Sequence, residues 1–200
     1  MNTFNALGLQ SDPIASFMVW LGEADAAGIA QSEAASLATV NSSGMPSIRT
    51  VLFKGLYSEA FGFFTNYNSP KARDLQNNAN AALLFFWQAQ ARQVRIVGKV
   101  EKLSEAQSRD YFASRDRGSQ IGAWASAQSE QLTSREQLLE QVTKLESQYA
   151  GLEVPCPPHW GGFKIVPSIM EFWQGREDRL HDRFQFVRTG FTWNYERLAP

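Results

Sequence analysis

The chain has 200 residues, of which 44% are hydrophobic and 20% are charged, and its formal net charge is -1. This composition is typical of a globular protein, and the near-neutral charge gives no reason to expect nucleic acid as a partner. One cysteine excludes an intrachain disulfide, and with only two histidines we expect no metal site. Residues 1–10 lack the features of a secretory signal, and the longest apolar run, residues 81–87, is too short to cross a membrane. We therefore expect a cytoplasmic protein without a membrane segment, forming one domain over residues 1–200 with a flexible segment at residues 1–11.

Strand and helix patterns alternate irregularly along the chain. A first helix is predicted from Pro13 to about Gly28. Strands are predicted at residues 36–40, 47–54, 60–65, 81–87, 93–103, 163–174, 183–188 and 191–198, and helices at residues 70–78, 104–114 and 133–149. Gly98 interrupts one strand, which indicates a bulge or a close approach of another backbone. Because strands follow strands without helical crossovers, we expect a mainly β, α+β fold: an antiparallel sheet or barrel with helices around it.

The last predicted helix shows the clearest amphipathic pattern. Thr133 and Glu136 resemble a capping box at its start. We expect its apolar stripe to lie in the core, namely Leu138, Val142, Leu145 and Tyr149.

Two groups of residues could bind a phosphate. Ser69-Pro70-Lys71 stands at a predicted helix start, where free N–H groups and a cation favour an anion, although an ordinary capped surface helix has the same pattern. Tyr111 and Arg115 share a helix face, and Ser119 follows shortly after. These three donors suit a phosphate monoester, and the alternative is a helix C-terminus with a favourable cation and a buried tyrosine.

A third group lies near the C-terminus, close in sequence to Trp173. If the backbone is extended there, Arg179, His181 and Arg183 point to one side, and an anion would offset their positive charge. A lone histidine is usually structural, but one flanked by arginines on the same face favours a site.

The strand at residues 47–54 raises a question of geometry. Strict alternation places Arg49 and Lys54 on opposite faces, so they serve one site only if the strand bulges or ends between them. Cys156 lies between prolines and is expected to be inert, and no Ser/His/Asp or Cys/His triad can be assembled. The sequence therefore favours phosphate-bearing ligands and a bound cofactor over a nucleophile.

At these residues the chain resembles the pyridoxamine 5'-phosphate oxidases, FMN-dependent enzymes of vitamin B6 metabolism. The similarity is carried by residues 49–54 (RTVLFK), 63–66 (FFTN), 69–72 (SPKA), 111–124 (YFASRDRGSQIGAW) and 171–183 (EFWQGREDRLHDR). The resemblance implies an FMN-binding split β-barrel and a homodimer with FMN at the interface. It further implies oxidation of pyridoxamine 5'-phosphate or pyridoxine 5'-phosphate to pyridoxal 5'-phosphate, with hydride transfer to the flavin and reoxidation by O2 to H2O2. Six Trp and fourteen Phe also exceed what a small barrel holds, which favours a subunit interface.

The resemblance assigns roles residue by residue. The residues matched to FMN binding are Arg49, Thr50, Val51, Leu52, Phe53, Lys54, Phe64, Thr65, Lys71, Gln93, Gln128, Ser129, Trp173 and Arg183. The residues matched to the substrate are Lys54, Tyr111, Arg115, Ser119, Arg179, Leu180 and His181. Arg179 and His181 are matched to the reacting face of the substrate, as catalytic residues. Arg49 and Lys54 would then bind different phosphates.

Three positions depart from the family pattern. Pro70 stands where many relatives carry an arginine, and Phe64 stands where they often carry a tyrosine. Residues 1–10 have no Arg or Tyr like those of the segment that covers the substrate in relatives. Two alternatives stay open: a split-barrel flavin oxidase of the phenazine-pathway type, and an FMN- or pyridoxal-phosphate-binding protein with little turnover.

Overall fold

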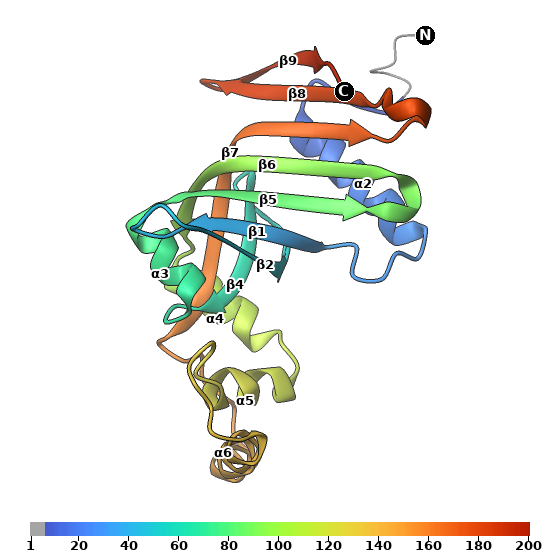
Figure 1. The fold of residues 1–200 in the computed structure, drawn as a ribbon. Coiled ribbons are helices and arrows are strands. Elements are labelled where there is room, and N and C mark those ends of the chain that lie inside the picture. The colour runs from blue at the N-terminus through green and yellow to red at the C-terminus, as the bar shows by residue number, and fades with distance from the viewer. Residues whose placement is uncertain (1–6) are drawn as a thin grey trace.

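The computed structural model describes residues 7–200, and its strands form one nine-stranded antiparallel sheet (Figure 1). The strands are β1 (Ala34–Val40), β2 (Pro46–Leu52), β3 (Leu56–Tyr57), β4 (Ala60–Asn66), β5 (Asn80–Trp87), β6 (Arg92–Lys102), β7 (Trp160–Gln174), β8 (Asp182–Thr189) and β9 (Thr192–Leu198). The helices are α2 (Pro13–Ala26), α3 (Pro70–Asn77), α4 (Glu105–Ala113), α5 (Arg117–Ala125) and α6 (Arg135–Gln148), with short 3-10 turns η1 (Gln88–Gln90) and η2 (Glu177–Arg179). The order along the sheet is β2-β1-β5-β6-β7-β4-β3, and β8 joins β7 and carries β9. This confirms the expected mainly β class with flanking helices.

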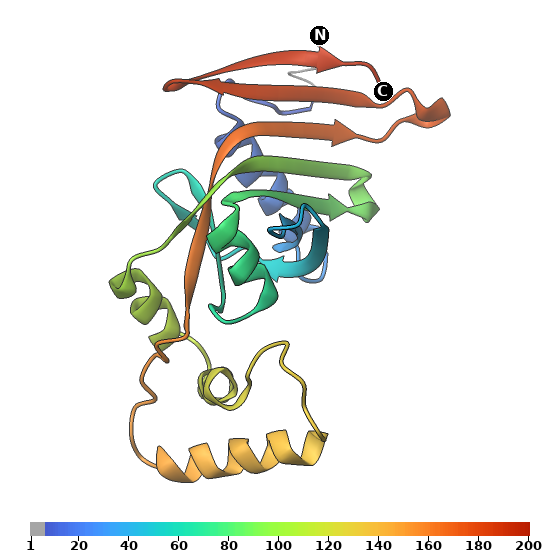
Figure 2. The same ribbon diagram turned by 60° about the vertical axis from the view of Figure 1, so that its left-hand side comes forward.

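The long strand β7 is where the sheet divides. Its first half pairs with β4 and its second half with β8, while β6 pairs along both halves. The register of β6 against β7 shifts between Val97 and Gly98. A Cβ at Gly98 would lie 2.0 Å from the carbonyl oxygen of Val166, so no larger residue fits without moving the backbone. The predicted close approach at Gly98 is thereby confirmed, and Figure 2 shows the resulting bend of β7.

The core lies between α2 and the sheet. Phe17 of α2 is fully buried, and its ring packs edge-to-face against Phe53, Phe61 and Phe85. Such aromatic pairs stabilise a core by about 0.5–1.5 kcal/mol each beyond the burial of their area. Phe53, which was matched to FMN binding, therefore contributes its side chain to the core.

The residues just before α2 pack against the core, within the stretch of residues 1–11 that was expected to be flexible. Leu7 and Leu9 are buried in the core, and the carbonyl oxygen of Leu7 accepts a hydrogen bond of 3.0 Å from Nε1 of Trp20. Residues 1–6 lie outside the described residues. The contact with Trp20, thirteen residues along the chain, is not visible in the local pattern of the segment.

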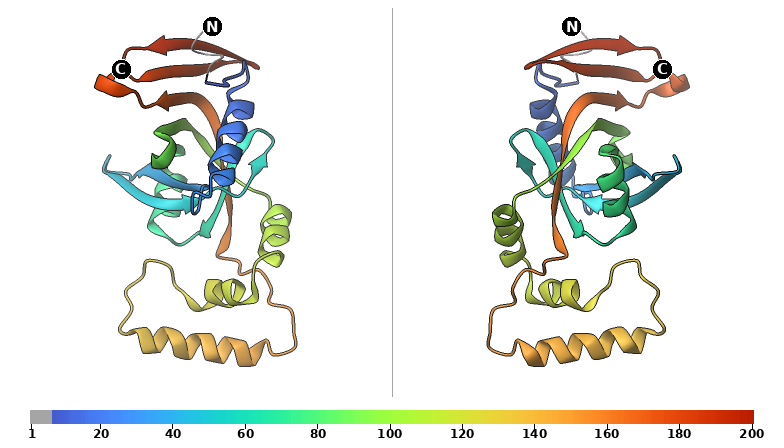
Figure 3. Two further views of the ribbon diagram at one scale, coloured as in Figure 1. Left: turned by 90° about the vertical axis from the view of Figure 1, so that its right-hand side faces the viewer. Right: turned by 90° about the vertical axis from the view of Figure 1, so that its left-hand side faces the viewer.

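Helices α5 and α6 lie at the end of the molecule far from β8 and β9 (Figure 3). The sequence patterns did not predict α5, since it contains Gly118 and Gly122 and its N-cap residue makes no side-chain capping bond. The expectation of a buried stripe on α6 was wrong, because none of its residues is fully buried. Val142 and Leu145 pack only partly, against a small second cluster around Phe112 and Ile121.

The start of α6 also differs by one residue from the prediction. Ser134, and not Thr133, is the N-cap, and its hydroxyl accepts a bond of 3.3 Å from the N–H of Gln137. Across residues 7–200 we find no helix that combines the length and the apolar character needed to span a membrane.

Candidate active site

A buried lysine at the start of α3 forms the first part of the site. Lys71 is 9% exposed, and its Nζ lies 3.0 Å from Oε1 of Gln128 and 3.3 Å from Oγ1 of Thr65. The Thr65 hydroxyl donates a bond of 2.9 Å to the same Gln128 oxygen. Burial, together with the positive charge of Arg49, lowers the pKa of Lys71. A buried ammonium beside a second cation is stabilised by an anion, so this group suits a phosphate.

Arg49 of β2 faces the same group and is held firmly in place. Its Nη1 donates to Oγ1 of Thr39 at 2.7 Å and its Nη2 to Oγ of Ser47 at 2.7 Å. The carboxylate of Asp74 lies 3.9 Å from Nη2 and accepts a bond of 2.7 Å from Thr39. Burial lowers the pKa of Arg49, and the charge of Asp74 opposes this shift. The arginine is therefore oriented before any ligand binds.

The N-cap of α3 adds a further donor. The Ser69 hydroxyl is fully buried, and within residues 7–200 it has no hydrogen-bond partner. Helix α3 begins at Pro70, as predicted, and proline at this position removes an N–H that the helix cannot use. We call Arg49, Thr65, Ser69, Lys71 and Gln128 the α3 phosphate cluster.

An aromatic wall stands on the other side of this region. The ring of Phe64 stacks on Tyr111 with centroids 3.8 Å apart, and on Trp160 at 5.3 Å. The guanidinium of Arg115 lies 4.8 Å from the centroid of Trp160. Its Nη1 is buried and has no hydrogen-bond partner within the described part of the chain, and burial lowers the pKa of Arg115. Tyr111 and Arg115 thus both contact Trp160, although Arg115 follows the end of α4 and does not share a helix face with Tyr111 as predicted. Arg115 has an unsatisfied donor of the kind that a phosphate oxygen would accept.

Sequence reasoning missed two members of this wall, Trp160 and Tyr57. The ring of Tyr57 packs edge-on against that of Phe64, with centroids 6.3 Å apart. Burial raises the pKa of Tyr57, and the nearby Tyr111 raises it further. The sequence signal for these rings was the presence of glycines within two strands. A Cβ at Gly62 would lie 2.4 Å from the ring of Tyr57, and a Cβ at Gly162 would lie 2.8 Å from the ring of Phe64. Small residues there leave room for the rings.

Two predicted substrate residues take other positions. Ser119 is exposed in the first turn of α5, on a different helix from Tyr111. The Nζ of Lys54 lies 3.3 Å from Oε1 of Glu33 and forms an ion pair with it. Strand β2 ends at Leu52, so alternation does not govern Lys54, and its N–H instead donates to Gly62 at 2.8 Å.

Other residues matched to FMN lie apart from these groups. Thr50 and Gln93 line a shallow groove of about 340 Å³ across β1, β2, β5 and β6. Val51 is buried, Leu52 is half-buried, and Ser129 follows Gln128 in an exposed loop with a φ of +68°.

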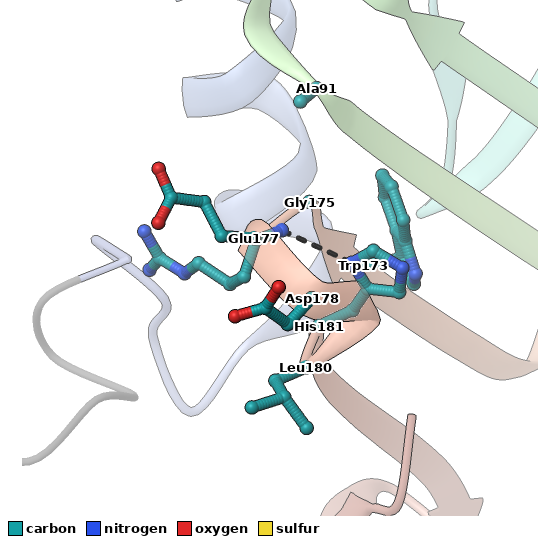
Figure 4. A pocket seen from close by; sticks show the side chains of 8 residues that line it. Ala91, Trp173, Gly175, Glu177, Asp178, Leu180 and His181 are labelled. Atoms are coloured by element: carbon teal, nitrogen blue, oxygen red, sulfur yellow. Dashed lines mark hydrogen bonds between the residues drawn. The ribbon is translucent and has the colours of Figure 1, made fainter.

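A pocket of about 920 Å³ lies at the turn between β7 and β8 (Figure 4). Trp173, Leu180 and His181 line it, as does Arg176. The His181 ring lies 4.6 Å from Trp173, and its Nδ1 accepts a bond of 3.1 Å from the backbone N–H of Arg176.

The expectation of an extended backbone through Arg179, His181 and Arg183 was wrong. Residues 177–179 form the turn η2, and Arg179 has a φ of +61°, so the alternation of side chains is lost. The reason is that the chain must reverse direction here to pair β7 with β8. The Nε of Arg183 donates a hydrogen bond of 2.8 Å to Oε1 of Glu171. The charge of Arg183 is therefore compensated by this carboxylate and adds no free charge beside His181.

Glu171 is itself a centre of ion pairing. It is 3% exposed and accepts bonds from both Arg183 and Arg95. Burial alone would raise its pKa, but the bonds from Arg183 and Arg95 outweigh burial, and the pKa of Glu171 is lowered. Arg183 also donates to the carbonyl oxygen of Ala199 at 2.9 Å, which ties it to the end of the chain.

The predicted site residues therefore form three groups within one protomer. The α3 phosphate cluster and the aromatic wall are neighbours through Thr65 and Phe64 of β4, whereas the pocket with Trp173 and His181 lies at the opposite end of β5 and β6 (Figure 1). Within residues 7–200 no cluster of three or more His, Cys, Asp or Glu could hold a metal ion.

Two family descriptions match the chain. Residues 21–149 match "Pyridoxamine 5'-phosphate oxidase", and residues 160–200 match "Pyridoxine 5'-phosphate oxidase C-terminal dimerisation region". Among solved structures, PhzG from Burkholderia lata 383, in complex with tetrahydrophenazine-1-carboxylic acid, superimposes with a TM-score of 0.90 at 32% identity, covering 96% of this chain and 94% of that one. An FMN-binding protein related to these oxidases, from Nostoc punctiforme, shares the fold with a TM-score of 0.76 at 15% identity, covering 96% of this chain and 100% of that one.

Relatives similar over nearly their whole length have one name in common. The pyridoxine/pyridoxamine 5'-phosphate oxidase of Psychromonas ingrahamii is 51% identical over 195 residues, which is 98% of this chain and 90% of that protein. The enzyme of the same name from Synechocystis is 47% identical over 188 residues, covering 94% and 88% of the two chains. The likeness thus spans nearly the whole chain, and the chain belongs to the pyridoxamine 5'-phosphate oxidase family.

Proposed function

We propose that this chain is an FMN-dependent oxidase that converts pyridoxamine 5'-phosphate or pyridoxine 5'-phosphate to pyridoxal 5'-phosphate. One observation carries the proposal: two separate groups with unsatisfied phosphate donors flank β4. A reaction between a phosphorylated cofactor and a phosphorylated substrate needs two such groups. The names of the relatives support the same reaction.

The α3 phosphate cluster fits the phosphate of FMN. Lys71 is buried beside Arg49, and a dianion would remove the penalty that their proximity imposes. The Ser69 hydroxyl would gain a partner there, and Thr65 and Gln128 would complete the contacts. Thr50 and Gln93, in the groove, would hold the ring and the ribityl chain. FMN supplies the acceptor of a hydride, which no side chain of the protein can replace.

The donors at the aromatic wall fit the phosphate of the substrate. Arg115 would donate from its unpaired Nη1, and Tyr111 would donate from its hydroxyl. Lys54 would leave its ion pair with Glu33 to bind the same phosphate, and the exposed Ser119 would turn toward it. Arg179 would stabilise charge on the substrate, and His181 would orient the reacting group. The second substrate in this proposal is O2, reduced to H2O2.

We further propose that each site is shared between two subunits of a homodimer. Trp173, Arg179 and His181 lie in the segment that matches a dimerisation region. In one protomer the turn between β7 and β8, which carries these residues, lies far along the sheet from the α3 phosphate cluster, so a second copy is needed to bring the two together (Figure 1). The single-domain organisation and a cytoplasmic location belong to the same proposal, and the latter rests on the single cysteine.

The first experiment is the anaerobic addition of pyridoxamine 5'-phosphate to the FMN-loaded protein. The proposal expects the visible flavin absorption to bleach, and to recover with formation of H2O2 when air is admitted. Bound FMN that does not bleach would contradict the proposal and would favour a binding protein. Arg179→Ala is expected to keep FMN bound and to lose the bleaching.

Subunit complementation tests the shared site. At an FMN concentration too low to load Lys71→Met, the Lys71→Met and Arg179→Ala proteins should each be inactive, but mixed dimers contain one site with both residues intact. After random exchange of subunits, about a quarter of the wild-type number of sites should therefore be active. No recovery of activity would place both residues of a site on one subunit.

A second candidate is oxidation of an unphosphorylated ring system, because PhzG, solved in complex with tetrahydrophenazine-1-carboxylic acid, has the same fold. Such a substrate leaves Arg115 without a phosphate partner. Faster bleaching with a tetrahydrophenazine carboxylic acid than with pyridoxamine 5'-phosphate would favour this candidate.

A further inference from the structure

The turn between β7 and β8 is strained. Asp178 and Arg179 are consecutive residues with φ values of +52° and +61°, and neither is a glycine. L-residues adopt this conformation only where the surrounding structure holds them in it. Inside the turn, a backbone bond of 3.0 Å runs from the N–H of Leu180 to the carbonyl oxygen of Glu177. One short turn of this kind does not restrain the two ends of the segment.

Arg176 restrains both ends. Its Nε donates to Oδ2 of Asp182 at 2.7 Å, so the first residue of the turn segment is joined to the residue that begins β8. Asp182 is 5% exposed and also accepts a bond from Arg197 of β9. A buried carboxylate with two charge-assisted bonds is a firm anchor. The guanidinium of Arg176 therefore closes the turn that carries Arg179 and His181.

The backbone of Arg176 acts on His181 directly. Its N–H donates to Nδ1 of the imidazole at 3.1 Å (Figure 4). A neutral imidazole carries one proton, and a nitrogen that accepts a bond does not hold it. The proton of neutral His181 is then on Nε2. Trp173, 4.6 Å away, fixes the ring from the other side.

We propose that Arg176 is a positioning residue for His181, which meets the substrate as a hydrogen-bond donor from Nε2 and does not act as a base. The proposal deepens the proposed function and rests on it, because it assigns the role of His181 in that reaction. An Nε2–H suits a lone-pair acceptor on the substrate. The guanidinium of Arg176 keeps the turn closed, and its N–H keeps the proton off Nδ1.

The tautomer can be measured in the intact protein, with and without FMN. The chain has two histidines, so a long-range nitrogen–proton NMR spectrum contains two ring systems, and His159→Gln identifies the other one. We expect His181 to carry its proton on Nε2 in the wild-type protein. In Arg176→Ala the ring should exchange between tautomers, and Arg176→Lys should restore the wild-type pattern. An Nδ1-protonated ring in the wild-type protein would overturn the proposal, whether or not any variant folds.

Kinetics supply the second readout. Arg176→Ala should lower kcat by about tenfold and change KM by less than about twofold, because the turn acts on the reacting group and not on the phosphate. Arg176→Lys should recover most of kcat. The matched control is Arg188→Ala, which removes another ion pair of β8, 2.9 Å from Glu59, and should leave kcat unchanged.

The outcomes of the two proposals can be told apart. Wild-type kcat in Arg176→Ala, with an unchanged His181 ring, would overturn the role of Arg176 and leave the oxidase function intact. A wild-type protein that does not oxidise the substrate would overturn the proposed function, while the ring spectrum would still decide the tautomer.

Discussion

The ammonium of Lys71 lies 3.0 Å from the side-chain oxygen of Gln128, although 57 residues separate them in the chain. The loop after α5 is thereby joined to the start of α3. Arg73 of α3 strengthens the link, since its Nη1 lies 3.6 Å from the carboxylate of Glu130. A ligand that binds Lys71 would therefore lie beside this loop.

Replacing Lys71 by methionine should weaken FMN binding by about 10- to 100-fold, the effect of losing a hydrogen bond to a charged group. The stability of the FMN-free protein should not fall, because burial and Arg49 already disfavour the charge of Lys71. Quenching of flavin fluorescence measures the affinity, and thermal unfolding measures the stability. Lys144→Met, on the exposed face of α6, should change neither quantity. Unchanged FMN affinity in Lys71→Met would remove Lys71 from the phosphate site.

Replacing Arg115 by methionine should affect the substrate and not FMN. The rate constant kcat/KM for pyridoxamine 5'-phosphate should fall by about 100-fold, while that for unphosphorylated pyridoxamine should change little. The reason is that the Nη1 of Arg115 has no protein partner within the described residues and is free to bind the phosphate. Arg109→Met, six residues earlier on α4, is the control, because Arg109 is exposed and pairs with Glu105. Loss of FMN binding in Arg115→Met would contradict the separation of the two phosphate sites.

Replacing Glu171 by glutamine should make stability less dependent on acid pH. The pKa of Glu171 is lowered in the folded protein below 4.5, so its carboxylate stabilises the fold above that pH. This contribution is lost as pH falls through the folded-state pKa. The free energy of unfolding of the wild-type protein should exceed that of Glu171→Gln by about 2 kcal/mol at pH 7. This difference should shrink below pH 4.5. Urea unfolding at several pH values measures it, and a difference that stays constant down to acid pH would contradict the role of the ion pairs.

Replacing Gly98 by alanine should destabilise the protein by about 3 kcal/mol or more, since the new Cβ would lie 2.0 Å from a backbone oxygen that cannot rotate away. Gly118→Ala is the opposite case, because nothing lies within 4 Å of that position in α5. Removing a glycine from a helix there should stabilise the protein by about 0.5–1 kcal/mol. Chemical denaturation of both variants checks the pair, and equal effects would show that the close approach at Gly98 is not tight.

The strands were predictable because their apolar patterns are local. Residues 81–87 and 93–103 were expected as strands, and they form β5 and β6 within a residue or so. The irregularity at Gly98 was also predictable, since a glycine inside a strand often marks a bulge or a close backbone approach. Helix α5 was hidden by its glycines, which lower helix propensity although packing against α6 and the second cluster still supports the helix.

The site was predictable to a different degree. Tyr111 and Arg115 both contact Trp160, but α4 ends at Ala113, so Arg115 lies outside the helix and the predicted shared helix face is wrong. The turn at Arg179 was not predictable, because a positive φ at a non-glycine residue leaves no mark in the sequence. Trp160 and Tyr57 were missed because only the pairing of distant strands brings them to Phe64.

Strand β7 carries Trp160 at its first residue and Trp173 near its last. At roughly 3.3 Å per residue, thirteen steps of strand separate the two rings by about 43 Å of backbone at most. The length of β7, together with its bend opposite Gly98, therefore sets how far the aromatic wall lies from the pocket at η2. An insertion or deletion of one residue in β7 would change the spacing between Trp160 and Trp173. It would also move every later residue of the strand to the opposite face of the sheet. Changes in chain length within this family should therefore accumulate in the loop before α6 and spare β7.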